Sequence, residues 1–110
     1  MPDSLWELKN LEEFYIGTNN IKVIPKEIEN LQSLKYLSLK NNLISFIPEE
    51  IGKLTSLECL DLEAIHTTNF PETFLNLRNL RELQVLLEYR ISQKIKNLLK
   101  KLKDRGVVIY

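Results

Sequence analysis

The sequence predicts an α/β solenoid with a parallel, concave β-sheet, an irregular or short-helical convex side, and a C-terminal capping helix and strand. The first supporting observation is that the four prolines, Pro2, Pro25, Pro48 and Pro71, lie 23 residues apart. The second is that apolar residues keep the same step, and the third is that this step gives way to helical spacing near the C-terminus. A fixed period of this length is typical of solenoids, in which each repeat stacks only on its neighbours.

Each repeat contains one expected strand. Apolar residues alternate with other residues at 14–16, 37–39, 60–62 and 83–85, which is the pattern of a short strand with one buried face. Strands at a constant 23-residue step pair in parallel, about 4.8 Å apart, so equivalent residues form columns across the sheet. Proline has no amide hydrogen and a fixed φ, so each proline is expected on the return segment of its repeat.

An asparagine follows two of the expected strands, at Asn19 and Asn42. An amide side chain at a turn bonds neighbouring backbone groups, so we expect these two residues to be structural. Ile65 and Glu88 occupy the equivalent positions later in the chain, which predicts a looser turn across 64–69.

The C-terminal segment predicts a cap for the solenoid. Its apolar residues recur with helical spacing, and lysines fill the positions between them. The apolar stripe comprises Ile91, Ile95, Leu98, Leu99 and Leu102. Gly106 is a natural helix stop, and 107–110 is expected to form a last strand parallel to the one before the helix.

The repeat unit has the form L-x-x-L-x-L-x-x-N-x-I/L-x-x-I/F-P-x-x-I/F-x-x-L, and residues 11–31 and 34–54 match it with conservative departures at Phe14 and Ile16. This unit resembles the 23-residue leucine-rich repeat, found in bacterial leucine-rich repeat proteins, Ras-associated scaffolds and plant intracellular immune receptors. We expect one domain over 1–110: a partial repeat at 1–10, repeats at 11–33, 34–56 and 57–79, and a last repeat with its cap at 80–110.

Composition excludes several classes of protein. No apolar run approaches the ~18 residues of a membrane span, and the first residues lack the basic and apolar regions of a signal peptide. Cys59 is the single cysteine, so no internal disulfide forms. The absence of cysteine caps favours a reducing compartment, which leans toward the cytoplasm, or a bacterial origin.

The sequence offers no arrangement typical of catalysis. One histidine and one cysteine cannot form a multi-ligand metal site, and we expect His66 to lie too far from Cys59 for a nucleophile pair. Acids fall on the strands, but paired carboxylates need a deep cleft that shifts one pKa, which an open sheet does not provide. We therefore expect no enzyme activity, no cofactor and no metal.

The resemblance implies a protein-binding module whose strand residues line a concave face. Carried over by position, the expected partner-binding residues are Glu13, Tyr15, Tyr36, Lys40, Asp61 and Glu63. The two tyrosines are the expected anchors, because large amphipathic rings dominate many interfaces. Leu86 and Leu87 fall on the same face, and we expect the C-terminal segment to cover them.

The N-terminal end predicts self-association. The chain starts in mid-repeat, so the strand near 13–16 is expected at an unpaired edge beside Leu5, Trp6 and Leu8. A homodimer through this edge, or membership in a longer repeat array, is the first alternative function.

The distribution of charge along the chain predicts a second alternative function. Residues 1–77 carry six lysines against twelve acids, whereas 78–110 carry nine basic residues against three acids. The basic residues of the C-terminal helix, Lys94, Lys96, Lys100, Lys101, Lys103 and Arg105, offer a surface for an anionic partner. The apolar stripe favours capping instead, and this disfavours nucleic acid or a membrane surface as the partner.

Overall fold

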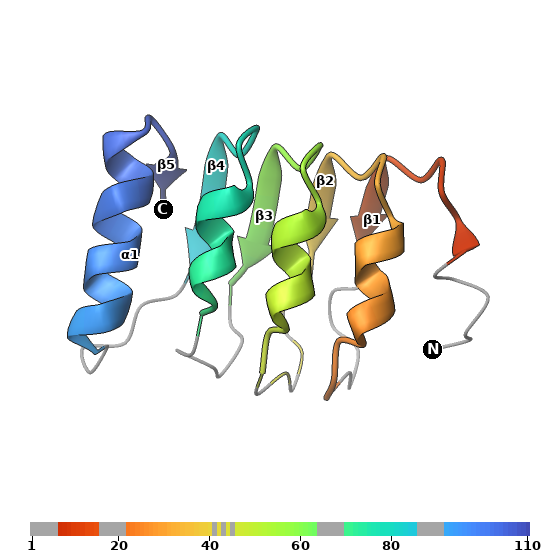
Figure 1. The fold of residues 1–110 in the computed structure, drawn as a ribbon, viewed down its shortest axis with the longest axis horizontal. Coiled ribbons are helices and arrows are strands. Elements are labelled where there is room, and N and C mark those ends of the chain that lie inside the picture. Colours follow the sequence, from red (N-terminus) through yellow and green to blue (C-terminus); the bar gives the residue numbers. More distant parts are fainter. Residues whose placement is uncertain are drawn as a thin grey trace.

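The computed structural model describes residues 7–15, 22–40, 42, 44, 46–63, 70–85 and 92–110. Four strands alternate with three short 3-10 helices, and one α-helix precedes the last strand (Figure 1). The strands are β1 (Glu13–Tyr15), β2 (Tyr36–Ser38), β3 (Cys59–Leu62), β4 (Glu82–Val85) and β5 (Val108–Ile109). The helices are η2 (Lys26–Asn30), η3 (Glu49–Lys53), η4 (Glu72–Asn76) and α1 (Gln93–Asp104).

The five strands form one parallel sheet in chain order, β1-β2-β3-β4-β5. The register follows the repeat: Tyr36 pairs with Cys59, and Cys59 pairs with Glu82, each 23 residues further along the chain. The predicted columns and the predicted α/β solenoid are therefore confirmed. The strand bounds differ slightly from expectation, since the last strand covers 108–109 rather than 107–110.

The 3-10 helices form the second layer of the molecule. Each begins directly after a proline, at Pro25, Pro48 and Pro71, whose φ lies between −73° and −70°. Proline fixes φ in this range and has no amide hydrogen, so it ends an extended segment and starts the return. In Figure 1 these helices lie side by side on one face of the sheet. We call the opposite face of the sheet, formed by alternate strand residues, the open face.

The core lies between the two layers and is built from equivalent positions. Leu31, Leu54 and Leu77, which follow the 3-10 helices, are fully buried. Leu37, Leu60 and Leu83 of the sheet are also fully buried. Burial of such side chains contributes about 1.5–3 kcal/mol each, so the columns of leucine stabilise the stack.

Helix α1 closes the C-terminal end, as predicted. Ile95, Leu98, Leu99 and Leu102 are buried in the same core as the repeats, and the exposed lysines lie between them. The Ser92 hydroxyl caps the helix by accepting a hydrogen bond from the amide of Ile95 at 3.2 Å. Gly106 ends it with a φ of 94°, a left-handed conformation that favours glycine.

Asn42 has the structural role expected of it. It is buried, and its side-chain amide donates to the carbonyls of Leu39 and Lys40 at 3.0 and 3.3 Å. The expectations for Asn19, for the turn across 64–69 and for Leu86 and Leu87 fall outside the described residues. The division into repeats stays a prediction.

Candidate functional site

Two tyrosines form the most prominent feature of the open face. Tyr15 of β1 and Tyr36 of β2 stack with ring centroids 4.7 Å apart and an interplanar angle of 29°. Tyr15 pairs across the strands with Ser38, so the two rings stack diagonally between β1 and β2. The Tyr15 side chain remains 62% exposed, so a large apolar ring faces solvent.

The basic residues at the margins of this face each pair with an acid 23 residues away along the chain. Lys35 lies 3.5 Å from Glu12, and Arg81 lies 3.8 Å from Glu58. Lys40 and Glu63, both predicted to bind a partner, form a third pair at 3.9 Å. Such exposed pairs contribute under about 1 kcal/mol each to the stability of the fold.

Asp61 lies deeper than its predicted role requires. It is 5% exposed, its Oδ1 accepts the amide of Glu63 at 3.0 Å, and the Ser38 hydroxyl donates to Oδ2 at 3.5 Å. Its position in the central strand buries it between neighbouring columns, which the spacing alone does not reveal. Because the Asp61 carboxylate is buried, its charge acts on the open face mainly through its electrostatic field and not through direct contact.

Cys59 of β3 and Glu82 of β4 lie next to the tyrosines on the open face. The Cys59 thiol donates to Oε2 of Glu82 at 3.8 Å, and burial, followed by the charges of Glu82 and Asp61, raises the pKa of the thiol to about 11. Burial also raises the pKa of Tyr36, with smaller contributions from Cys59, Asp61, Tyr15 and Glu82. Anionic charge thus gathers around these two residues.

An open hollow of about 390 Å³ lies beside Tyr36. Its lining residues come from three neighbouring strands and their entries: Lys35, Tyr36, Glu58, Cys59, Arg81 and Glu82. In the described parts of the chain, no group of three or more His, Cys, Asp or Glu side chains could hold a metal ion.

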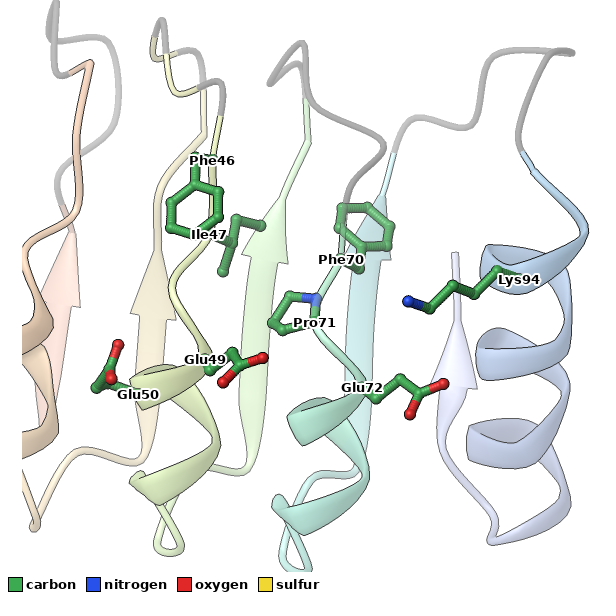
Figure 2. A pocket seen from close by; sticks show the side chains of 8 residues that line it. All are labelled: Phe46, Ile47, Glu49, Glu50, Phe70, Pro71, Glu72 and Lys94. Carbon is green, nitrogen blue, oxygen red and sulfur yellow. The ribbon is translucent and has the colours of Figure 1, made fainter.

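A second groove, also about 390 Å³, lies on the helical layer (Figure 2). Figure 2 shows Phe46 and Phe70 at one end, Glu49 and Glu72 at the other, and Lys94 reaching in from α1. Phe46 is 54% exposed. The repeat pattern did not indicate this groove. Phe46 lies two residues before Pro48, but the equivalent positions before Pro25 and Pro71 are Val23 and Asn69, so no apolar column marks the place.

The residues predicted for self-association are only partly described. Leu8 is 49% exposed, while Leu5 and Trp6 fall outside the described residues. Strand β1 is the first strand of the sheet order. No helix in the described part of the chain is both long enough and apolar enough to cross a membrane.

A family model for a leucine-rich repeat region matches residues 8–107. The chain belongs to the leucine-rich repeat family. This fold is generally a protein-interaction module, its members generally bind protein partners, and they are typically not enzymes.

Solved structures agree with this assignment. A leucine-rich repeat protein of Leptospira interrogans is 34% identical, with a TM-score of 0.89 over 100% of this chain and 28% of that one. An internalin (inlF) of Listeria monocytogenes is 26% identical, with a TM-score of 0.75 over 96% of this chain and 29% of that one. Internalin C2 of the same species shares the fold at 23% identity and a TM-score of 0.66, covering 81% of this chain and 40% of that one.

The leucine-rich repeat chain described here therefore spans less than half the length of each of these three structures. A comparison with functionally curated proteins found no match.

Proposed function

We propose that this leucine-rich repeat chain is a non-catalytic module that binds a protein partner on the open face of its sheet. The observation that carries the proposal is the stacked pair formed by Tyr15, which is exposed, and Tyr36, which is half-buried. Stacked tyrosines offer a large, rigid and amphipathic contact area, and ordering them on binding costs little conformational entropy. No described element packs on this face, since the 3-10 helices lie on the other one (Figure 1).

The size of the face limits its affinity. Five strands about 4.8 Å apart, each offering roughly five residues of about 3.3 Å, present roughly 400 Å². A standard interface uses about 800 Å² from each partner. The chain therefore binds weakly by this face alone, or binds with its edges or as part of a longer array, as its partial coverage of the related structures supports.

Capture of proteins from a lysate of the source organism tests the proposal. The test variant is Tyr15→Ala with Tyr36→Ala, and the matched control is Val23→Ala with Phe46→Ala, which removes exposed apolar side chains elsewhere. We expect the tyrosine variant to retain roughly a tenth or less of the captured partner, as for hot-spot residues. Equal capture by the wild type and the tyrosine variant would reject the open face as the binding surface.

A second candidate function is supported by the lysines of α1. Lys94, Lys96, Lys100, Lys101 and Lys103 are exposed, and none forms an ion pair with another described residue. Binding of an anionic polymer through them would weaken steeply with salt. Retention on heparin that is lost when two of these lysines are changed to glutamate would support this function, and no retention at low salt would remove it.

A further inference from the structure

We propose that the partner presents a lysine- or arginine-bearing segment to the open face. The receiving surface, which we call the tyrosine–carboxylate patch, consists of Glu13, Tyr15, Tyr36, Asp61 and Glu82. This inference rests on the proposed function of the open face and adds the chemical class of its partner.

The first support is the balance of charge on the face. The ion pairs of Lys35, Lys40 and Arg81 engage Glu12, Glu63 and Glu58, which all lie toward the margins. The three carboxylates of the patch, Glu13, Asp61 and Glu82, have no cation partner among the described residues. The centre of the face is therefore anionic.

The second support is that the patch is closely spaced. Tyr36 pairs with Glu13 on one side and with Cys59 on the other, and Cys59 pairs with Glu82. Asp61 lies two residues beyond Cys59 and on the same face of the sheet, where alternate strand residues point the same way. The negative field is strong enough at Tyr36 and Cys59 to contribute to the raised pKa of both groups.

The third support is the aromatic pair. The faces of tyrosine rings attract ammonium and guanidinium groups, and a guanidinium also stacks on them. The Tyr15 ring is accessible, and the Asp61 carboxylate lies in the floor of the patch close to Tyr36. A cation over the rings would therefore be attracted both by the rings and by the carboxylates.

Other partner chemistries fit less well. An acidic segment would meet three carboxylates of the same charge. A purely apolar segment would stack on the rings but would remove water from Glu13 and Glu82 without pairing them, which carries a large desolvation cost. A basic side chain meets both the rings and the charges.

NMR titration with a synthetic peptide tests the inference. The probe is a soluble peptide of alternating glycine and arginine, and the control peptide has glutamate in place of arginine. At roughly 20 mM salt, where charges are little screened, we expect the arginine peptide to shift the amide signals of Tyr15, Tyr36 and Asp61. We expect no such shifts with the glutamate peptide.

Substitutions in the protein show which residues of the patch contact the arginine peptide. Glu13→Gln with Glu82→Gln keeps the shape of the patch and removes two charges, so we expect arginine-peptide binding to weaken by roughly fivefold or more. Tyr15→Ala with Tyr36→Ala is expected to weaken it by roughly threefold or more. Glu49→Gln with Glu72→Gln, on the groove of the helical layer, is the matched control and is expected to leave binding unchanged.

Several results would overturn the inference. One is the absence of shifts at millimolar peptide, and another is equal binding of both peptides. A third is a set of shifts confined to the helical layer. Concentration-dependent shifts of the same patch amides in the protein alone would instead assign the patch to a second copy of this chain.

The inference and the proposed function can fail separately. If capture from lysate depends on the tyrosines while the arginine peptide does not bind, the open face is correct and the partner chemistry is wrong. If neither result is obtained, both are rejected.

Discussion

Gly52 of η3 lies directly against Thr73 of the adjacent helix η4. A Cβ at this position would lie 2.5 Å from the Cβ of Thr73 and 2.6 Å from its carbonyl oxygen. The Thr73 hydroxyl also donates to the carbonyl of Glu49 at 2.8 Å, which holds η4 against η3. Glycine at this place allows the repeats to stack.

We predict that Gly52→Ala lowers the free energy of unfolding by about 1–3 kcal/mol, because the added methyl group forces the two helices apart. Urea unfolding followed by circular dichroism measures the change. Glu29→Ala, at the equivalent position of η2, is the control and should cost under about 1 kcal/mol, the value of its exposed ion pair with Lys53. An unchanged free energy in Gly52→Ala would show that the helices accommodate the methyl group.

We predict that the Cys59 thiol reacts slowly, because its burial and the nearby charges of Glu82 and Asp61 disfavour the thiolate. Its pKa of about 11 compares with an ordinary value of 9.0, so at pH 8 we predict alkylation by iodoacetamide roughly a hundredfold slower than for an unfolded cysteine. Glu82→Gln removes a negative charge beside the thiol, so the pKa should fall and the rate should rise. The rate measured against pH checks both statements, and a wild-type midpoint near 9 would contradict them.

At the scale of elements, Arg105 connects the end of α1 to η4. Its guanidinium donates to the carbonyls of Leu75 and Leu77, the latter at 3.1 Å, at the end of η4. These bonds satisfy backbone groups at the end of a helix and fix the position of the cap. Arg105 is therefore less available to an anionic partner than the lysines of α1.

We predict that Arg105→Ala lowers the free energy of unfolding by about 1–3 kcal/mol, since bonds from a charged donor to two carbonyls are lost. Arg105→Lys should recover only part of this, because an ammonium cannot reproduce the planar fork of the guanidinium. Hydrogen exchange of the α1 amides should accelerate in the same order. Arg78→Ala, an exposed arginine, is the control, and an equal loss in both alanine variants would indicate a general charge effect.

At the scale of the whole molecule, the two ends of the sheet differ. Strand β5 lies beside α1, whereas β1 has a described neighbour only in β2 (Figure 1). An unpaired edge is a template for another strand, and the half-exposed Leu8 is the described member of the predicted self-association surface.

We predict that the chain dimerises reversibly through this end at about 10–100 µM, as measured by sedimentation over a dilution series. Leu8→Glu should weaken the dimer, because it places a charge at the apolar contact, whereas Val23→Glu, at another exposed apolar residue, should not. A monomer at every concentration, with Trp6 fluorescence unaffected by dilution, would show that this end is sealed within the chain.

The sequence by itself determined the repeat, the parallel sheet and the cap. The 23-residue step places Tyr36, Cys59 and Glu82 in one column of the sheet. The apolar stripe of the C-terminal helix, which includes Ile95 and Leu102, has to be buried, and it packs on the core of the repeats. These features depend on spacing, and spacing is visible in a single sequence.

Only the tertiary structure decided which open-face side chains meet and which are buried. Lys40 and Glu63 are paired with each other, Asp61 is buried and bonded to Ser38, and Arg105 is bonded to backbone carbonyls. The physical reason is that rotamers and the stacking of neighbouring strands set these contacts. The column pattern places a residue on a face, but it does not fix how deep its side chain lies or which neighbour it bonds.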